Sequence, residues 1–426
     1  MGMKALVIGS GGREHTLIWK LKQSKKIDKI FCAPGNGGIT QGAKCINIEP
    51  DNVKGLCDFA LRNKVGLTVV GPEDPLAAGI VDEFQKRKLR IFGPDKEGAR
   101  LEASKVFAKE FMRKYHIPTA PFKVFDSISE ATGFCKSVEF PIVIKADGLA
   151  AGKGAVIVRN AEEATRTLEE MMVKKVFGKA GKQVIIESFL KGRELSIMAI
   201  CDGKTYLPML PSQDHKQAFD GDKGPNTGGM GAYCPVPFVD EDMLKEIEEH
   251  VLIPTVDGLK AEGIRYRGVI YAGLMMTDDG PRVLEYNVRF GDPETQAVLP
   301  LLKSDLADLM LATVNGKLAS FGKLDWYDES AVCVIMASKG YPGSYKKGLP
   351  ITGLQLQENN AFIFHAGTSR KGNRFFTNGG RVLGVMAYDK SLKKAISRAY
   401  KIVDKVKFDG AHYRKDIGSR AGHPAK

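Results

Sequence analysis

The chain has 426 residues, of which 43% are hydrophobic and 27% charged, ordinary proportions for a globular protein. At ~150 residues per domain, this length predicts roughly three domains. No apolar run approaches the ~20 residues needed to span a bilayer, and Met1–Ser10 lacks the charged start and cleavage site of a signal peptide. We therefore expect a soluble, cytoplasmic protein with no membrane partner.

The formal net charge of +13 admits two interpretations. A basic excess is typical of nucleic-acid-binding proteins and of proteins that bind small polyanions. The lysines are spread along the chain, with no dense basic tract interleaved with aromatic residues. We expect a solvated basic surface, no nucleic-acid partner, and a few lysines beside phosphates. The seven scattered cysteines form no CxxC pair, which argues against a zinc ribbon or a redox dithiol.

The N-terminal part alternates apolar runs with amphipathic stretches, the pattern of a parallel α/β sheet. Each expected strand is followed by a turn rich in Gly or Pro. Because the carboxyl ends of parallel strands meet along one crevice, these turns are expected to share one ligand site. The expected strands are Met3–Ile8, Ile30–Ala33, Leu67–Val70 and Arg90–Phe92, and the expected helices are Glu14–Lys22, Val53–Asn63 and Pro75–Lys88.

The loop Gly9–Gly12 follows the first strand and opens a helix, as in dinucleotide-binding folds. The third glycine of that fingerprint is replaced by Glu14, and the second strand runs into Pro34 without an acidic residue. A nicotinamide-dependent dehydrogenase is therefore disfavoured. Two interpretations of the loop stay open: a tight turn without a ligand, and helix N-terminal amides that bind a phosphate.

The remaining chain predicts a change from parallel α/β structure to hairpins. The expected order is a helix at Ser104–Tyr115, a compact unit of strands and a helix at Phe122–Phe189, β-hairpins from Gly192, a polar loop at Ser212–Gly231, a helix, a hairpin through Glu285, and short strands with Gly-rich turns from Ala331.

A glycine-rich loop at residues 147–154 joins two strands of the compact unit. It is not a Walker A motif, because Asp147 and Gly154 stand where that motif needs Gly and Ser or Thr. It fits a hairpin whose backbone amides cover phosphates, with Lys145 and Lys153 adding charge. A strand-end lysine that only reaches solvent is the alternative for Lys145.

A second nucleotide signal is the apolar strand Val184–Leu190, which carries Glu187. An extended edge of this kind can hydrogen-bond an adenine through its backbone. The nearby Glu194 can accept hydrogen bonds from ribose hydroxyls. Each of these carboxylates alone would be unremarkable.

Glu285 and Asn287 alternate on one expected strand, so both side chains project from the same face. Two oxygen donors on one face, followed by Arg289, suit Mg²⁺, which prefers oxygen ligands shared with phosphates. An exposed polar face would fit this short motif too. The order of strand lysine, glycine loop, strand edge and late E-x-N-x-R is far more specific than any part.

With these motifs in order, the chain resembles the ATP-grasp superfamily and, within it, the phosphoribosylamine–glycine ligase (glycinamide ribonucleotide synthetase) family. The resemblance covers essentially the whole chain. It rests on the blocks Gly11–His15, Ala33–Asn36, Lys145–Gly154, Ser212–Lys216, Gly224–Tyr233, Arg289–Gln296, Thr377–Arg381 and Arg414–Gly418.

The resemblance implies an α/β fold with an ATP-grasp core, an N-terminal Rossmann-like domain, a mobile ATP lid and a C-terminal β-rich domain. The boundaries that we expect are 1–103 for the N-terminal substrate domain, 104–121 and 192–328 for the core, 122–191 for the lid, and 329–426 for the C-terminal domain.

It also implies the ATP-dependent ligation of glycine to 5-phosphoribosylamine in de novo purine biosynthesis. The products are glycinamide ribonucleotide, ADP and phosphate, formed through glycyl phosphate. ATP and Mg²⁺ (or Mn²⁺) are the expected cofactors, the two small substrates are the expected partners, and a monomer is expected.

By the same resemblance, Lys145 and Arg289 are the expected catalytic residues, and Glu285 and Asn287 the metal ligands. The wider superfamily often has a second acidic ligand on the preceding strand, which Tyr271–Met276 lacks, so the metal count stays open. The expected nucleotide-binding residues are Lys105, Lys145, Gly148, Leu149, Lys153, Gly154, Glu187, Phe189, Leu190 and Glu194, and the expected substrate-binding residues are Gly11, Gly12, Asn36, Glu73, Asp214, Lys216, Arg289, Asp292 and Arg381.

Two further classes of function remain as alternatives. A biotin-dependent carboxylase or a carboxylating purine enzyme would share the nucleotide end and depend on bicarbonate instead of glycine. A basic nucleic-acid-binding protein would show salt-sensitive binding to DNA or RNA, although nothing in the motif order requires it.

Overall fold

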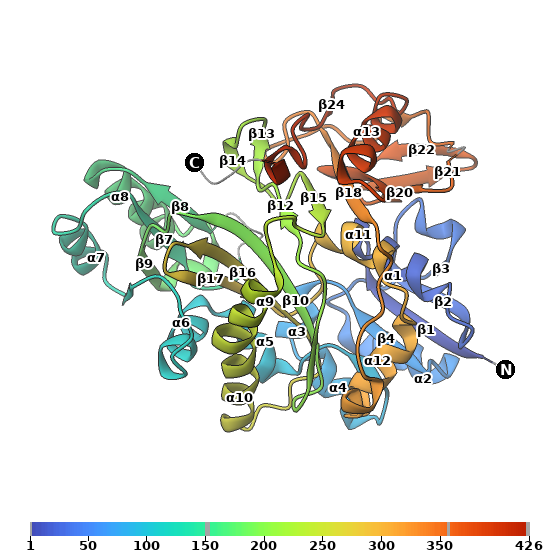
Figure 1. Cartoon of the computed structure of the whole chain (residues 1–426), viewed down its shortest axis with the longest axis horizontal. Coiled ribbons are helices and arrows are strands. Elements are labelled where there is room, and N and C mark those ends of the chain that lie inside the picture. The colour runs from blue at the N-terminus through green and yellow to red at the C-terminus, as the bar shows by residue number, and fades with distance from the viewer. Residues whose placement is uncertain (1, 150–153, 356–357, 423–426) are drawn as a thin grey trace.

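The computed structural model describes residues 2–149, 154–355 and 358–422. Figure 1 shows the N-terminal sheet and the C-terminal strands at one end of the long axis, and the smaller unit of β6–β9, α7 and α8 at the other. The largest buried apolar cluster runs from Leu6 through Ile197 to Val385, so it joins the N-terminal, central and C-terminal sheets. No helix among the described residues has the length and hydropathy to cross a membrane.

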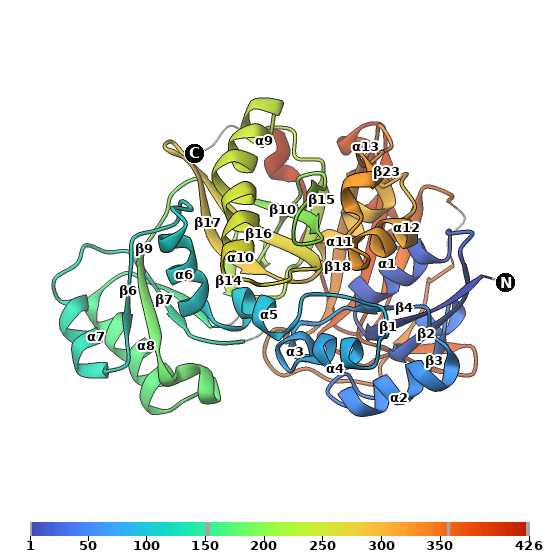
Figure 2. The ribbon, with the colours of Figure 1, turned by 90° about the horizontal axis from the view of Figure 1, so that it is seen from below.

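The N-terminal region is a five-stranded sheet in the order β3-β2-β1-β4-β5, and every neighbouring pair is parallel, as predicted. Figure 2 shows α2, α3 and α4 on one face, with α1 and α12 (Leu306–Val314) on the other. The bounds are β1 Met3–Gly9, β2 Ile27–Pro34, β3 Lys44–Cys45, β4 Leu67–Val70, β5 Ile91–Phe92, α1 Gly12–Leu21, α2 Val53–Asn63, α3 Glu73–Ala77 and α4 Ile80–Lys86.

The helix predicted at Pro75–Lys88 is two helices in the structure. Between α3 and α4 stands Gly79, whose φ of 88° lies in the left-handed region that ends a helix. α3 is therefore a short turn that begins directly beyond β4, and Glu73, its first residue, lies at the carboxyl end of that strand.

The expected lid unit is a separate antiparallel sheet in the order β6-β9-β7-β8, with its own apolar core around Ile144, Ile186 and Leu168. Its described residues form two α-helices, α7 and α8, where one helix was expected. The bounds are β6 Phe122–Phe125, α7 Ile128–Cys135, β7 Ile142–Ala146, β8 Ala155–Val158, α8 Ala161–Leu168, η2 Glu169–Val173, η3 Gly178–Lys182 and β9 Val184–Ser188.

The central region is an antiparallel sheet in the order β11-β10-β16-β17, reached through α5 and α6. A long helical segment formed by α9, η4 and α10 crosses it (Figure 1). The bounds are α5 Lys96–Ala103, α6 Lys105–Lys114, β10 Arg193–Cys201, β11 Tyr206–Pro208, α9 Glu241–Ile247, η4 Glu248–Leu252, α10 Ile253–Ala261, β16 Gly268–Thr277, β17 Gly280–Asn287, α11 Glu294–Val298 and η5 Leu299–Leu301.

The C-terminal region is β-rich, as expected, but also carries the helix α13, which the sequence reading missed. Its main sheet has the order β12-β15-β18-β23-β20, and β24 also pairs with β18. A second small sheet is β19-β22-β21. The bounds are η6 Leu318–Phe321, β18 Ser330–Ser338, β19 Pro350–Ile351, β20 Ala361–His365, β21 Thr368–Lys371, β22 Arg374–Thr377, β23 Arg381–Asp389, α13 Leu392–Val403, β24 Ala411–His412 and η7 Ser419–Gly422.

Two strands of this C-terminal sheet come from the polar loop predicted at Ser212–Gly231 and the residues after it. They are β12 (Gln213–Asp214) and β15 (Gly231–Cys234), and β15 pairs along its length with β18. Between them, β13 (Gln217–Phe219) and β14 (Lys223–Asn226) form a hairpin of their own. The sheet therefore contains residues from both sides of the boundary expected at 329.

A buried histidine pair joins the N-terminal helix α1 to the C-terminal strand β20. The backbone N–H of His365 donates a hydrogen bond to His15 Nδ1 at 2.8 Å, and the rings of Phe362 and Phe364 meet the His15 ring edge-on. Burial lowers the pKa of His15 from 6.5 to about 3 and that of His365 to about 4. Both imidazoles are therefore neutral in the folded state at neutral pH.

We expect these histidines to make the protein acid-sensitive. Because the folded pKa of His15 lies below 6.5, its contribution is complete above pH 6.5 and is lost as the pH falls toward 3. Each proton that only the unfolded chain binds lowers the free energy of unfolding by about 1.4 kcal/mol per pH unit. His15→Asn keeps an acceptor and removes the titration, so urea unfolding of this variant should depend less steeply on pH.

The matched control is His116→Asn, at an exposed turn whose φ of 55° asparagine tolerates. Its unfolding over the same pH range is the reference for a histidine-to-asparagine change at an exposed position. Equal slopes for His15→Asn and the parent chain between pH 6.5 and pH 3 would contradict the assignment.

Candidate active site

The predicted site residues meet where the N-terminal sheet, the lid unit and the end of β17 come together. Arg289, just after β17, lies with its Nε 3.2 Å from Glu73 Oε2 at the start of α3. From the lid side, Lys145 Nζ donates a hydrogen bond of 2.9 Å to the carbonyl oxygen of Leu284 in β17. One region therefore brings together residues far apart in the sequence.

The glycine-rich loop of the lid is tied to the first turn of α6. Lys105 Nζ donates to the carbonyl oxygen of Gly148 at 2.7 Å. Asp147 Oδ1 accepts hydrogen bonds from Ser104 Oγ and from the backbone N–H of Val106, both at 3.0 Å. A carboxylate at a helix N-terminus is favourable, so Asp147 holds the start of the loop beside Lys105.

A buried ion-pair triad lies behind this loop. Glu187, on β9, pairs with Lys145 through one carboxylate oxygen and with Lys109 of α6 through the other, the latter at 2.5 Å. All three side chains are less than 10% exposed. Burial alone would raise the pKa of Glu187, but the charges of Lys145 and Lys109 hold it below its ordinary value.

Lys109 is the member of the triad that the sequence reading missed. It also donates to Thr119 Oγ1 at 2.6 Å, and burial lowers its pKa from 10.5 to about 8. The available signal was its place one helical turn after Lys105, which puts both on neighbouring positions of one face. Lys145 is likewise buried and paired, so the alternative of a strand-end lysine that reaches solvent is wrong for this structure.

The expected metal ligands lie side by side on β17. Glu285 and Asn287 share a face, while Tyr286 between them is buried on the other. The Glu285 side chain is 40% exposed, and its nearest cation is Lys216 Nζ at 3.7 Å. Burial would raise the pKa of Glu285, but the charges of Lys216, Lys145 and Lys105 bring it below its ordinary value.

These two side chains fit a magnesium ion shared with phosphates. No hydrogen bond among the described residues occupies the Glu285 carboxylate or the Asn287 amide oxygen, so both stay available as oxygen donors. Mg²⁺ typically takes one or two carboxylates and completes its shell with water and phosphate. Among the described residues no group of three His, Cys, Asp or Glu could hold a metal ion.

A second set of carboxylates surrounds Lys216. Its Nζ lies 3.7 Å from Glu194 Oε2 as well as from Glu285. Asp214, on β12, is 6% exposed, and no described residue donates a hydrogen bond to its carboxylate. Burial raises its pKa to about 8; Lys216 opposes this, and Glu294 and the other carboxylates add to it. The cluster holds more negative charge than Lys216 compensates.

Glu294, at the start of α11, is part of the same cluster and was not among the expected site residues. It is 3% exposed and accepts a hydrogen bond from the Tyr271 hydroxyl at 2.6 Å. That hydroxyl also lies 2.9 Å from Ser196 Oγ. Tyr271 comes from β16, the strand that lacks an acidic residue, so a carboxylate from α11 approaches that strand instead.

Arg289 is held between two carboxylates. Besides Glu73, its NH2 group pairs with Glu102 Oε1 at 2.9 Å, and Glu102 Oε2 accepts from the backbone N–H of Val288 at 2.7 Å. Burial raises the pKa of Glu102 to about 7 despite the guanidinium. For Glu73, Arg289 and Arg13 outweigh the effect of burial and lower its pKa to about 2. Arg13 and Glu102 were both missed from the sequence.

Arg381, on β23, closes the C-terminal side of the site. Its guanidinium pairs with Asp292 Oδ2 at 3.2 Å and donates to the carbonyl oxygens of Asp292 and Gly228 at 2.7 and 2.5 Å. Gln296 donates to the other Asp292 oxygen at 2.7 Å. Asp292 and Arg381 therefore meet as expected, with most of their hydrogen-bonding capacity used within the protein.

The first glycine loop is closed by Glu14. The backbone N–H of Gly11 donates to Glu14 Oε2 at 2.5 Å, and a Cβ on Gly12 would lie 2.7 Å from Gln296 Nε2. Of the two interpretations left open, this geometry favours the capped tight turn over a row of free amides. Asn36 is similar, because its side chain bonds the backbone of Ser10, His365, Gly38 and Ile39.

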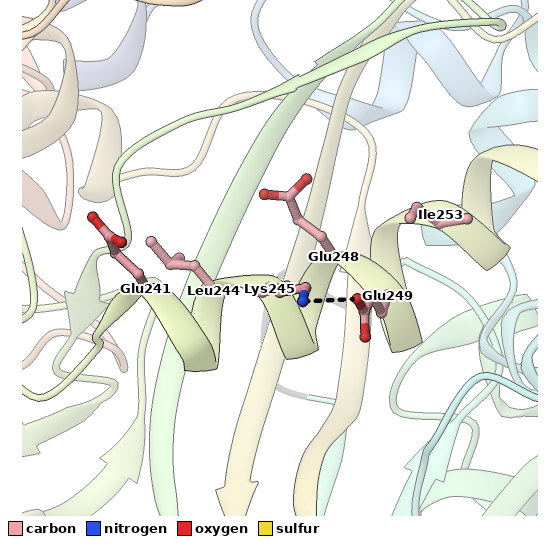
Figure 3. Close-up of a pocket in the computed structure, with 6 residues that line it drawn as sticks. All are labelled: Glu241, Leu244, Lys245, Glu248, Glu249 and Ile253. Atoms are coloured by element: carbon pink, nitrogen blue, oxygen red, sulfur yellow. Dashed lines mark ion pairs between the residues drawn. The ribbon is translucent and has the colours of Figure 1, made fainter.

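A surface hollow lies elsewhere, along the outer side of α9 and η4. Figure 3 shows its lining side chains, with an ion pair between Lys245 and Glu249 at 3.8 Å. None of the expected site residues lines it. The predicted site residues therefore lie outside this hollow.

Comparison with known proteins gives the family. Models of phosphoribosylglycinamide synthetase match three consecutive parts: the N domain at residues 3–102, the ATP-grasp (A) domain at 103–295 and the C domain at 331–420. A protein of Caldanaerobacter subterraneus subsp. tengcongensis named phosphoribosylamine–glycine ligase is 54% identical over 417 residues, covering 98% of this chain and 100% of the relative.

The chain belongs to the phosphoribosylglycinamide synthetase family. This confirms the resemblance seen in the sequence. A solved phosphoribosylamine–glycine ligase from Thermotoga maritima is 36% identical, with a TM-score of 0.85 over 97% of this chain and 100% of that one. A biotin carboxylase of Campylobacter jejuni superimposes with a TM-score of 0.75 at 15% identity over 99% of this chain and 96% of that one, a likeness of fold alone.

For this member of the synthetase family, the structure brings most expected residues together. Lys105 bonds Gly148 and Lys145 pairs with Glu187, while Glu194, Lys216, Asp214 and Glu285 form a second cluster of charges. Four more expected residues lie on segments next to these groups: Leu149, Gly154, Phe189 and Leu190. Among the described residues, no side-chain interaction marks a role for them. Lys153 lies outside the described residues. Every individual binding role remains a prediction.

We expect Lys109→Met to weaken the nucleotide end of the site. It leaves Glu187 with one cation in a buried position, so the free energy of unfolding should fall by roughly 2 kcal/mol and KM for ATP should rise. Urea unfolding and steady-state kinetics measure the two effects. Lys114→Met, on the exposed side of the same helix, is the control. Equal behaviour of the two variants would show that Lys109 has no such part.

We expect Glu285→Gln to raise the Mg²⁺ concentration that gives half-maximal activity by roughly tenfold or more, because a carboxylate ligand becomes a neutral amide. A magnesium titration at fixed total ATP measures this. Glu249→Gln, an exposed change on η4, should leave the titration unmoved. A normal titration for Glu285→Gln would remove this residue from the metal shell.

Proposed function

We propose that the chain joins glycine to 5-phosphoribosylamine at the expense of ATP, giving glycinamide ribonucleotide, ADP and phosphate in de novo purine biosynthesis. The observation that carries the proposal is the full-length relationship to proteins named phosphoribosylamine–glycine ligase. The site supports it as well, because lysines suited to phosphates and a cluster suited to amines lie in one region.

The chemistry requires activation of a carboxylate. Transfer of the γ-phosphoryl group to a glycine carboxylate oxygen gives ADP and glycyl phosphate, which has a good leaving group. The amine nitrogen of phosphoribosylamine then attacks the carbonyl carbon, phosphate leaves with the carbon–oxygen bond pair, and the nitrogen loses a proton. In such transfers the protein supplies mainly position and charge.

The phosphate side of the site is built for an anionic nucleotide. Lys105 and Lys145 are fixed by their contacts with Gly148 and Leu284, so their charges are in place before ATP binds. Preorganised charge is worth more than charge that must be gathered during the reaction. Bound to Glu285 and Asn287, Mg²⁺ would supply charge neutralisation between phosphate oxygens.

Arg289 is our candidate for neutralising the acyl phosphate. Two carboxylates orient its guanidinium, so it is aligned without contribution from the substrate. Beside Lys216, the carboxyl group of Asp214 accepts no hydrogen bond from a described residue, and with its neighbour Glu294 it suits a cationic or amine group, which supports placing an amine substrate there. Closure of the lid would exclude water from glycyl phosphate, which water hydrolyses.

The boundaries expected for the four domains, a monomeric state and a cytoplasmic location belong to this proposal too. The first rests on the resemblance and on the separate lid sheet. The monomeric state rests on the resemblance, and the cytoplasmic location rests on the proposed part in purine biosynthesis.

The direct test is ADP release in the presence of Mg²⁺, glycine and phosphoribosylamine, the last made in place from ribose 5-phosphate and ammonia. We expect release only when glycine and the amine are both present. Omission of either one is the control, and replacement of glycine by bicarbonate tests the carboxylase alternative.

ADP release that is independent of glycine, or that requires bicarbonate, would overturn the substrate assignment and leave ATP-grasp chemistry in place. Salt-sensitive binding to DNA or RNA without any ADP release would favour the nucleic-acid alternative.

A further inference from the structure

The block Arg414–Gly418 carried the family resemblance, yet none of its residues entered the site. In the structure Arg414 is completely buried, which is rare for an arginine unless it is paired. Its Nε and NH2 groups donate to the two oxygens of Asp416 at 2.7 and 2.6 Å, a bidentate contact. Its NH1 group donates to Asp222 Oδ1 at 2.9 Å and to the Gln217 carbonyl oxygen at 3.2 Å.

These contacts join the end of the chain to the β13–β14 hairpin. Figure 1 shows η7, the dark red helix near the C-terminus, beside that hairpin. Asp416 also accepts from the backbone N–H of Gly221 at 2.9 Å, and Asp220 accepts from the backbone N–H of Lys415 at 2.8 Å. His412 Nε2 lies 2.7 Å from the Ala218 carbonyl oxygen. The first strand, β13, and the turn of the hairpin are thus held by the C-terminal segment.

The hairpin begins at the residue after Lys216. The carbonyl oxygen of Lys216 accepts hydrogen bonds of 2.8 Å from the backbone N–H and the hydroxyl of Thr227, so the two ends of the hairpin close beneath it. Arg414 donates to the carbonyl oxygen of the next residue, Gln217. One buried guanidinium is therefore fixed against the backbone that sets the position of Lys216.

Two further contacts place the same C-terminal segment against this part of the site. The backbone N–H of Gly418 donates to His215 Nε2 at 3.4 Å, one residue before Lys216. Arg420 pairs with Asp222. Burial lowers the pKa of Arg420, and the negative charges of Glu194 and Asp214 oppose that change, which puts its guanidinium within electrostatic reach of both.

We propose that Arg414, with Asp416 and Asp222, is a positioning residue for the ligation site: it holds the β13–β14 hairpin so that Lys216 stays between Glu194 and Glu285. The proposal rests on the proposed function, which gives Lys216 its part in binding substrate. Arg414 takes no chemical part in the reaction. Its effect passes through the backbone of Gln217 and the charges of the hairpin.

Steady-state ligation kinetics on the full chain test the inference. Arg414→Met should lower kcat/KM roughly tenfold or more, because a displacement of about 1 Å at a site is costly. Arg414→Lys keeps the charge without the bidentate contact and should recover part of the loss. The matched control is Arg398→Met, which removes ion pairs with Glu358 and Asp389 in the same region, away from the hairpin, and should change kcat/KM less than about twofold.

A double-variant cycle separates positioning from general stability. In a Lys216→Met background, Arg414→Met should cause no further loss beyond about twofold, because the residue it positions is already gone. Losses that multiply in the double variant, or an Arg414→Met chain that behaves as Arg398→Met does, would overturn the proposal. If Arg414→Met does not fold, Asp222→Asn replaces it in the same cycle with the same expected result.

Hydrogen exchange makes the outcome independent of activity. Amides of residues 217–226 should exchange faster in the Arg414 variant than in the Arg398 control, and equal exchange overturns the proposal. If the parent chain shows no glycine-dependent ADP release, the proposed function fails and the exchange measurement alone decides the part of Arg414.

Discussion

Arg289 occupies the position on which the assembly of the site depends. Its guanidinium meets Glu73, which begins a helix beyond the N-terminal sheet, and Glu102, which comes from α5. Removing one member of a buried charge group leaves an uncompensated charge at a cost of several kcal/mol, on the order of 3–5. The ion pairs of Arg289 with Glu73 and Glu102 therefore fix the end of β17 relative to the N-terminal sheet.

Two groups of charged side chains in the site differ in the sign of their excess charge. In one group, Lys109 and Lys145 both pair with the carboxylate of Glu187, and Lys105 lies within electrostatic reach of Lys145. In the other group Lys216 is surrounded by carboxylates from β10, β12, β17 and α11. Under the function that we propose, this separation of charge would favour the anionic nucleotide at one group and the amine at the other. The net charge of +13 says nothing of this separation.

The sequence predicted what depends on local pattern. Periodicity predicts the strands β1 and β4 and the shared face of Glu285 and Asn287. The geometry of parallel sheets predicts that the loops at the strand ends meet. Lys109 and Glu102 were not predicted as site residues, because each lies on an ordinary amphipathic helix. Only the tertiary fold shows that the charged side chain is buried. The helix α13 was not predicted, because the Gly-rich turns of its region were interpreted as connections between short strands.

Other misses have the same origin. The split at Gly79 requires a backbone angle that the residue permits but does not require. The pairing of β15 with β18 requires knowledge of a sheet assembled from distant segments, which no local pattern carries. The family resemblance supplied the roles of most site residues, whereas the buried charge partners that hold those residues in place came from the structure alone.

That shared sheet also constrains how the chain can be made. Gly231–Cys234 finds its partner Ala331–Val334 only after the β16–β17 hairpin and the helices α9 to α12 have been synthesised. Until then one edge of β15 has unpaired backbone groups, the kind of edge that recruits other strands. A chain divided before β18 would not give two self-sufficient halves, since each would carry part of one sheet. The C-terminal region is a partner in folding as well as a neighbour of the site.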